Sequence, residues 1–427
     1  MLEILRASDP SASERLDAIL SRRRADDTAV SVSDIIESVR TTGDAALLDF
    51  TTRFDHVDLD ASRLRVSPDE IAAATVDPRT DAAMRRAIER IDTFHRNEQR
   101  DDWWSVSPDG AVLGQRIVPI DSVGIYVPGG AAPYASSLLM NVIPARIAGV
   151  RRIVAVTPPG RDGAIDESIL VAARLCGVHE LYRVGGAQAI AALAYGTSSI
   201  VRVDKIVGPG NAYVATAKRL VYGLVGIDTI AGPSEVVVLA DGSADPRFIA
   251  ADLAAQAEHG GAFVVLVTTS SDLVSAVVAE LERSIPMLER AETIRSALSK
   301  GLAIVAGSLD EAIDCAERIA PEHLELHIED PLPVAKSVRT AGVVLCGAYG
   351  PAAICDYGLG PNHVLPTGGT ARFSSALGVD DFTRRMSIAY PTQEAFADVA
   401  PDGIALAEAE RLTAHAAALR IRSEVNR

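Results

Sequence analysis

The sequence predicts an α/β protein in which helices cover both faces of open parallel sheets. From Val118 onward, short β-branched runs bounded by glycine and proline alternate with alanine-rich segments that are long enough for helices. Apolar runs separated by helix-length segments are typical of parallel strands with helices on both faces. The length of 427 residues, at about 100 to 200 residues per domain, allows two to four domains. We expect right-handed crossovers between such strands.

The elements are expected in the following order. Residues 1 to about 118 are charge-rich and mostly helical in pattern, with one clear apolar stripe formed by Ala83, Ala87, Ile88, Ile91 and Phe94. Strands are then expected at Val123–Val127, Arg152–Val156, Glu180–Val184, Lys205–Val207, Glu235–Ala240, Phe263–Thr268, Ala303–Ala306, Leu324–Ile328 and Val343–Cys346. The last segment, from about Gly378, reads as helical and could dock elsewhere, including on another subunit.

One β-α-β unit can be drawn residue by residue. The strand Glu235–Ala240 is followed by Asp245, which can cap a helix whose first residue is Pro246. Gly260-Gly261 ends this helix before the strand Phe263–Thr268. This unit predicts two neighbouring parallel strands with a helix between them.

Composition excludes several classes of function. Hydrophobic residues make up 48% of the chain and charged residues 23%, which is typical of a globular protein. The formal net charge of −16 would repel a phosphate backbone or an anionic membrane, so we expect no nucleic-acid partner. No stretch reaches the roughly 18 to 20 apolar residues that cross a bilayer.

Cysteine usage and the N-terminus indicate a cytoplasmic protein. The four cysteines match neither a CxxC redox motif nor a paired zinc knuckle, and they are Cys176, Cys315, Cys346 and Cys355. A reducing compartment therefore fits best. The first ten residues carry acids where a signal peptide needs a basic flank and an apolar run, so we expect no export.

Three glycine-rich turns follow expected strands. Gly185-Gly186-Ala-Gln188 and Gly208-Pro-Gly210-Asn211 each open a helix, whose N–H groups and dipole would point toward an anion such as a pyrophosphate. Tyr126-Val-Pro-Gly-Gly130 adds an aromatic ring that could stack on a flat ligand. None of the three is the GxGxxG fingerprint. Taken alone, each turn also fits a purely structural role.

Two groups carry metal-binding or acid–base residue types. Gln256 and His259, three positions apart at the end of the helix described above, could converge on one point, although glutamine is a weak metal ligand and a histidine cap is common. In Pro321-Glu-His-Leu-Glu-Leu-His327, alternation places His323, Glu325 and His327 on one strand face. A glutamate beside a histidine suits proton transfer, but a solvated strand face has the same pattern.

Other polar residues and several absences narrow the choice. Asp356 and His363 lie in a loop rich in turn formers, and loops often carry function. Glu408, Glu410 and His415 lie on the expected C-terminal helix, where acids normally face solvent. The sequence has no GKS/T phosphate loop, no HExxH and no GxSxG elbow, which argues against kinase, zinc protease and serine hydrolase activities.

Together these motifs resemble histidinol dehydrogenase over nearly the whole chain. The similarity lies in blocks that occur in the family's order: Gly185-Gly-Ala-Gln-Ala-Ile-Ala-Ala-Leu-Ala194, Gly208-Pro-Gly-Asn211, Ala231-Gly-Pro-Ser-Glu235, Gln256-Ala-Glu-His259, Pro321-Glu-His-Leu324 and Pro361-Asn-His-Val-Leu-Pro-Thr367. The resemblance implies oxidation of L-histidinol to L-histidine through L-histidinal with two NAD, one zinc ion per subunit and a homodimer. It also implies two Rossmann-like domains.

The resemblance also implies roles for individual residues. Glu322 and His323 would be the catalytic pair, with His323 taking the alcohol proton and Glu322 activating water. The zinc ligands would be Gln256, His259, Asp356 and His415, the last from the partner subunit. Substrate contacts would come from Ser234, Gln256, His259, His323, Asp356, Glu410 and His415, with His363 as a further candidate. NAD would contact Tyr126, Gln188 and Asn211.

The domain boundaries that follow are an N-terminal helical segment at 1–24, a discontinuous Rossmann-like domain at 25–122 plus 239–377 that carries the metal and catalytic residues, a second Rossmann-like domain at 123–238 on the NAD side, and a helical domain at 378–427 that reaches the partner. One departure from the family pattern is Cys355, where we would expect glycine. A cysteine there would strain the backbone if the position required positive φ.

Two alternatives remain at this point. A paralogue on the same scaffold could oxidise a different polar primary alcohol, because fold and cofactor motifs do not determine the substrate. Glu410 and His415 argue against it, since both substrate positions are filled as the resemblance requires. A protein that only binds metal or nucleotide is the other alternative, and the presence of both Glu322 and His323 argues against it.

Overall fold

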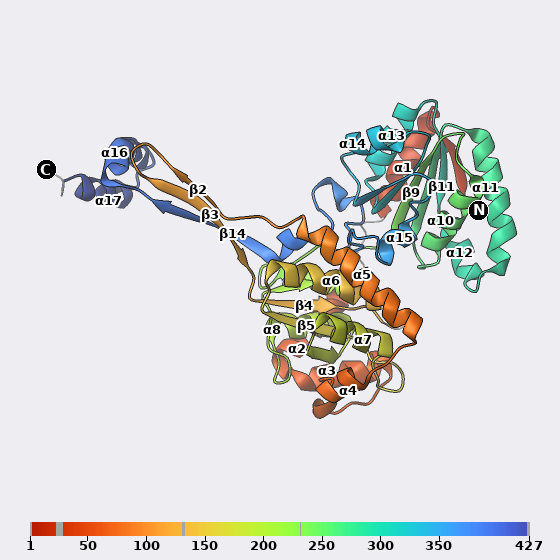
Figure 1. Ribbon diagram of the computed structural model, residues 1–427, viewed down its shortest axis with the longest axis horizontal. Coiled ribbons are helices and arrows are strands. Elements are labelled where there is room, and N and C mark those ends of the chain that lie inside the picture. The colour runs from red at the N-terminus through yellow and green to blue at the C-terminus, as the bar shows by residue number, and fades with distance from the viewer. Residues whose placement is uncertain (1, 23–28, 130–132, 231, 425–427) are drawn as a thin grey trace. The chain divides into compact units, whose positions relative to one another are not determined.

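The computed structural model describes residues 2–22, 29–129, 133–230 and 232–424 (Figure 1). The chain divides into two compact units, Met1–Glu98 with Ile120–Phe382 and Gln99–Pro119 with Thr383–Arg427, which we call unit 1 and unit 2. Gly130 and Ala231, named in two motifs above, lie outside the described residues. Among the described helices, none is both long and apolar enough to cross a membrane.

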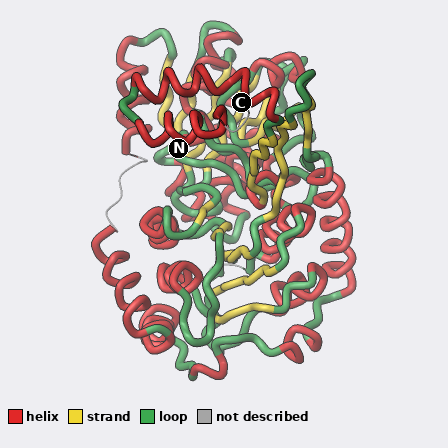
Figure 2. Tube along the Cα trace, turned by 90° about the vertical axis from the view of Figure 1, so that its left-hand side faces the viewer, coloured by secondary structure: helices red, strands yellow, loops and turns green. Residues whose placement is uncertain are grey.

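Unit 1 contains two parallel sheets, and the first, sheet A, has the order β1-β11-β10-β9-β12-β13. Its strands are β1 (Glu3–Arg6), β9 (Glu235–Ala240), β10 (Phe263–Thr268), β11 (Leu302–Val305), β12 (His323–His327) and β13 (Val343–Cys346). Every residue of β9 and β10 is buried, because helices cover both faces of the sheet. Figure 2 shows strands in yellow with red helices on either side.

Alternating side chains of β9 enter two separate cores. Val236 and Val238 pack against α10 (Pro246–Ala257), α11 (Ser271–Ser284) and α12 (Ala291–Leu298). Val237 and Leu239 face the opposite core with α1 (Pro10–Arg22) and α13 (Leu309–Ile319). The sheet thus separates two helical layers, as period-two alternation in a strand requires. Two short helices, α14 (Pro331–Ser337) and α15 (Ala352–Asp356), follow β12 and β13 in the chain.

The second parallel sheet, sheet B, has the order β6-β5-β4-β7-β8. Its strands are β4 (Ser122–Tyr126), β5 (Arg152–Thr157), β6 (Glu180–Arg183), β7 (Lys205–Val207) and β8 (Gly226–Ile227). One face packs on α5 (Pro78–Arg96), α6 (Ala135–Ala148) and α7 (Glu167–Cys176), and the other on α2 (Ala29–Thr42), α8 (Gly186–Tyr195) and α9 (Ala212–Val221). Shorter helical segments are α3 (Asp44–Phe50), α4 (Pro68–Ala73), Thr51–Asp55, Ala61–Arg63, Ile285–Met287, Thr370–Arg372 and Val379–Phe382.

Unit 2 is an antiparallel sheet with two helices. The sheet order is β14-β3-β2, formed by β14 (Thr383–Tyr390), β3 (Val112–Pro119) and β2 (Trp103–Val106). Within this unit, α16 (Gln393–Ala409) and α17 (Thr413–Glu424) contact each other beyond the sheet (Figure 1). All four residues of β2 are exposed.

The predicted parallel strands are confirmed, and β7, β9, β10 and β13 have the expected bounds. The expectation of helix throughout 378–427 is wrong for β14, which pairs with β3 more than 260 residues away. None of the residues of β14 is fully buried, so the segment lacks the apolar pattern that marks a strand in the sequence. The helix α2, which belongs to the expected domain at 25–122 plus 239–377, contacts α8 and α9 beside sheet B. An apolar stripe on a helix does not indicate which sheet it covers.

Candidate active site

The predicted catalytic pair lies at the amino end of β12, against the amino end of β9. Glu322 Oε2 accepts a hydrogen bond from the Glu235 N–H at 2.8 Å. His323 Nδ1 lies 3.1 Å from the Glu235 carbonyl oxygen, which can only accept, so Nδ1 is the donor. This contact leaves His323 Nε2 as the ring atom available for chemistry. Both side chains are held in place by backbone that belongs to the sheet itself.

His323 Nε2 faces the carboxylate of Asp356. The distance from Nε2 to Asp356 Oδ1 is 3.7 Å, and Nε2 is buried without a hydrogen-bond partner among the described residues. Burial acts to lower the pKa of His323, but the Glu322 and Asp356 carboxylates outweigh it and raise the pKa to about 10. Near neutral pH a histidine with this pKa carries a proton on Nε2 as well as on Nδ1, so Nε2 can accept a proton only after it has released that one.

The helix α15, which ends at Asp356, lies against α10, which carries the predicted ligand Gln256. Burial disfavours the charged form of Asp356, but His323, His363 and His259 hold the Asp356 pKa below its usual range. Gln256 is buried in the last turn of α10, and α10 contacts α15, which ends at Asp356. The expectation that Gln256 and His259 share a helix face is wrong in detail. The helix ends at Ala257, and His259 lies in the exposed turn that follows.

Two neighbours of Asp356, His363 and Cys355, make contacts that hold them in place. His363 Nδ1 donates to the Asp356 carbonyl oxygen at 3.0 Å, and its Nε2 lies 3.2 Å from Ser137 Oγ. Cys355 is fully buried beside Leu345, and its thiol points to the Pro361 carbonyl. Burial raises the pKa of Cys355 to about 12, and its φ is not positive, so the expected backbone strain is absent. The cysteine is therefore a packed thiol rather than a reactive one.

The predicted NAD residues lie at the carboxyl ends of sheet B strands. Tyr126 ends β4, and its hydroxyl oxygen accepts from the Gly186 N–H at 3.1 Å. Gln188, in the first turn of α8, is 1% exposed, and its Oε1 has no hydrogen-bond partner among the described residues. Asn211 caps α9 by accepting from the Val214 N–H at 3.1 Å. A buried amide oxygen without a partner beside a helix N-terminus suits a ligand that carries both donors and negative charge.

A buried ion pair that the sequence did not predict holds one of these turns. Gly208 has φ of +108°, and a Cβ there would lie 2.2 Å from the Tyr126 carbonyl oxygen. Lys218 Nζ donates to the Gly208 carbonyl at 2.9 Å, and the Gly208 N–H donates to Asp228 Oδ2 at 2.8 Å. Lys218 and Asp228 also pair with each other, and their side chains are 2% and 1% exposed. A lysine inside a helix pattern gives no sequence signal of burial, so this pair was missed.

The remaining predicted site residues lie in separate parts of the chain. Ser234 is half-buried and immediately precedes β9. Glu410 is the exposed C-cap of α16, and His415 is exposed on α17, both in unit 2. Arg411, between them, has φ of +60°, so the chain turns between the two helices rather than running as one helix. The structure therefore brings Glu322, His323 and Asp356 together, and Glu410 and His415 belong to another unit.

Comparison with known proteins decides the family. A family model described as histidinol dehydrogenase matches residues 20–423. The chain belongs to the histidinol dehydrogenase family. A histidinol dehydrogenase from Pseudomonas putida is 47% identical over 96% of this chain and 95% of its own length. One from Geobacter sulfurreducens is 50% identical over 92% of this chain and 92% of its own length.

A solved structure agrees with this assignment. The crystal structure of histidinol dehydrogenase from Elizabethkingia anophelis superposes with a TM-score of 0.90 at 37% identity, over 95% of this chain and 94% of that chain. The histidinol dehydrogenase family consists of NAD-dependent oxidoreductases, which need one site for the dinucleotide and one for the substrate. The turns of sheet B are the candidates for the dinucleotide, and the Glu322, His323 and Asp356 group is the candidate for the substrate.

Proposed function

We propose that this protein is an NAD-dependent, zinc-assisted histidinol dehydrogenase that oxidises L-histidinol to L-histidine through L-histidinal. The observation that carries the proposal is the meeting of His323 Nε2 and Asp356 Oδ1 at 3.7 Å, with Glu322 beside them, in a chain of this family. A base, a metal-binding carboxylate and a second acid–base group are what oxidation of an alcohol and then of a hydrated aldehyde needs.

The proposed metal ligands are Gln256, His259 and Asp356, together with the partner subunit's His415. Carboxylate, imidazole and amide oxygen are donors that zinc accepts, and the pKa of Asp356 is already held low by neighbouring histidines, so its carboxylate is ready to bind a cation. Zinc would supply a charged centre that holds and orients the amino alcohol. Substrate contacts are assigned to Ser234, Gln256, His259, His323, Asp356, Glu410 and His415.

The chain's own groups perform the proton transfers. In its neutral form, with Nδ1 protonated, His323 takes the proton of the alcohol oxygen at Nε2 while the carbinol hydrogen leaves as hydride to NAD, which gives the aldehyde. Glu322 then takes a proton from water as the water oxygen adds to the aldehyde carbon. The hydrated aldehyde loses its second hydride to a second NAD, and the product is the carboxylic acid. Tyr126, Gln188 and Asn211 are assigned to NAD binding.

The proposed enzyme is a homodimer in which unit 2 is covered by a second copy. Unit 2 exposes large apolar side chains, with Trp103 and Trp104 52% and 51% exposed and Tyr390 and Leu406 each 66% exposed. Exposed apolar patches of this kind mark interaction surfaces. Sedimentation should therefore give twice the 45.0 kDa chain mass, and Trp103→Asp should shift it toward the single chain. A parent protein that sediments as one chain would overturn the dimer.

The proposed reaction is tested by counting NADH formed per limiting L-histidinol in zinc-loaded protein. Two NADH per histidinol, and none after chelation of the metal, are expected because both oxidations occur at one metal-dependent site. One NADH per histidinol would show that oxidation stops at the aldehyde. No turnover of histidinol by protein that holds zinc, with turnover of another primary alcohol, would overturn the substrate assignment.

A further inference from the structure

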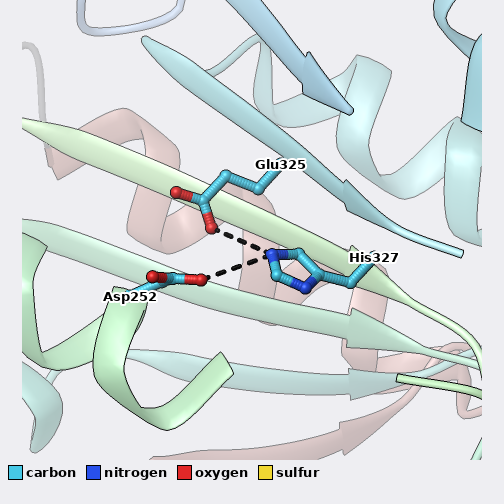
Figure 3. Close-up of side chains that lie close together, drawn as sticks. All are labelled: Asp252, Glu325 and His327. Carbon is cyan, nitrogen blue, oxygen red and sulfur yellow. Dashed lines mark ion pairs between the residues drawn. The ribbon is translucent and has the colours of Figure 1, made fainter. Parts of the chain in front are cut away.

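A second buried cluster lies on the same face of β12 as His323. His327 Nε2 is 3.3 Å from Asp252 Oδ2 and 3.5 Å from Glu325 Oε2 (Figure 3). Glu325 is fully buried, and the His327 and Asp252 side chains are 2% and 12% exposed. We call Asp252, Glu325 and His327 the buried triad. None of its members has a role in the proposed reaction.

The buried triad connects the two elements that carry proposed zinc ligands. Glu325 Oε1 accepts the N–H of Ala352, the first residue of α15, at 2.6 Å. That helix is five residues long and ends at Asp356. At the other side, Asp252 lies on α10 one turn before Gln256, so the two side chains share a helix face. The triad therefore runs from α10 through β12 to the start of α15.

The buried triad is suited to holding α15 in a fixed position relative to α10. A helix as short as α15 has little stability of its own, so the partner of its first N–H determines where its C-terminal residue lies. Buried carboxylates are tolerated only when they are paired, and His327 stands between both of them. Releasing any one member leaves an uncompensated buried group, which favours a single geometry of α10 relative to α15.

A cation in the triad is the competing interpretation, because one imidazole and two carboxylates are also metal donors. Two observations favour the histidine as the bridging group. One oxygen of Glu325 is already used by the Ala352 N–H, and His327 Nε2 is within ion-pair distance of both carboxylates without any further group. A protonated imidazole supplies the positive charge that a cation would otherwise supply.

We propose that Asp252, Glu325 and His327 are positioning residues that hold α10 and α15 at the separation at which Gln256 and Asp356 bind one zinc ion. This inference rests on the proposed function, because it uses the proposed ligand set. It predicts that the triad controls zinc affinity without touching the metal. Partners outside the ligand shell typically change metal affinity by about 10- to 100-fold when they are removed.

The test is zinc affinity, measured by chelator competition on the full-length dimeric protein. Glu325→Leu should weaken zinc binding about 10-fold or more, because α15 loses the acceptor at its first N–H. Glu325→Gln is the matched control, since its amide oxygen can still accept from Ala352, and it should retain most of the affinity. NAD affinity should be unchanged in both variants. If Glu325→Leu does not fold, Asp252→Ala is measured in its place, with a smaller loss expected because Asp252 is the more exposed carboxylate.

Three outcomes would overturn the inference. A folded Glu325→Leu protein with parental zinc affinity would show that the triad does not position the ligands. Equal losses in Glu325→Leu and Glu325→Gln would show that the acceptor to Ala352 is not the cause. Two metal ions per parent chain, falling to one in His327→Leu, would make the triad a cation site. The proposed function fails separately, if zinc binds as expected but histidinol is not oxidised.

Discussion

Five strands of sheet A follow the same order as the five strands of sheet B, but the two sheets place their proposed functional residues at opposite ends. In sheet B the order β6-β5-β4-β7-β8 is the Rossmann order 3-2-1-4-5, without a sixth strand, and Tyr126, Gly185 and Gly208 lie at or after the carboxyl ends of its strands. In sheet A the order β11-β10-β9-β12-β13 is equivalent, yet Ser234 precedes β9 and His323 begins β12. The rule that ligands lie at the carboxyl ends of strands therefore describes the proposed NAD side and not the proposed catalytic side.

The sheets also differ in how their buried charges are compensated. The turn at Gly208 depends on the ion pair of Lys218 and Asp228, which also bind its backbone carbonyl and N–H. The catalytic side depends on histidines between carboxylates, as in the buried triad, where the positive charge can be lost as a proton. The comparison predicts that the stability contributed by the buried triad depends on pH.

The largest expected effect is on stability and concerns sheet B. Lys218→Met should lower the free energy of unfolding by about 3 to 5 kcal/mol, because it leaves Asp228 buried without its partner. Chemical denaturation measures the change, and Lys300→Met, at an exposed lysine, is the control. A loss no larger than that of the control would show that the pair does not hold the turn.

The next effect is on catalysis and concerns sheet A. His323→Asn should reduce the rate of NAD reduction by about 10² or more, as expected for loss of a general base. Zinc content should stay at the parental level, since His323 is not among the proposed ligands. Steady-state kinetics and elemental analysis on the same preparation make the test. A variant that keeps parental activity would remove His323 from the mechanism.

A smaller effect, on the KM for NAD, distinguishes the proposed NAD side from the proposed substrate side. Gln188→Ala should raise the KM for NAD by about 3- to 10-fold, the worth of one hydrogen bond, and leave the KM for histidinol unchanged. Its buried Oε1 has no partner among the described residues, so we expect NAD to provide one. Equal changes in both KM values would contradict the separation of the NAD and substrate sides.

The smallest effect is the pH dependence of the triad. Burial acts to lower the pKa of His327, but Asp252 and Glu325 outweigh it and raise the pKa to about 9. Because this value lies above the ordinary histidine pKa of about 6.5, the stabilisation is complete below about pH 6.5 and is lost as the pH rises toward 9. The stability difference between the parent and His327→Gln should therefore shrink over this window. The exposed His179, changed to Gln, should show no such trend.

The sequence predicts a strand well where all of its residues are buried. It predicts a strand poorly where the strand is partly exposed and pairs with a segment far away in the chain. Runs such as Val236–Leu239 and Val264–Val267 predict buried parallel strands because every residue is apolar. β14 and β3 are partly exposed and pair across the length of the chain, so their local pattern carries little signal.

The same limit applies to the candidate site. Alternation along β12 correctly placed His323, Glu325 and His327 on one face, but no spacing rule brings Asp252 of α10 to His327. Lys218 was missed because its burial follows from the position of Asp228. Cys355 departs from the family pattern, in which we expect glycine. It lies in the helix α15 and does not have positive φ, so the cysteine causes no backbone strain of that kind.

The most direct test of the separation between the two sheets is NAD binding to an Asp356→Ala variant that has lost its zinc. Calorimetric titration with NAD should give a Kd within about 3-fold of the parent, because the residues assigned to NAD binding include neither Asp356 nor any other proposed zinc ligand. Loss of NAD binding together with zinc would contradict the account, since the dinucleotide would then depend on the amino ends of sheet A rather than on the turns of sheet B.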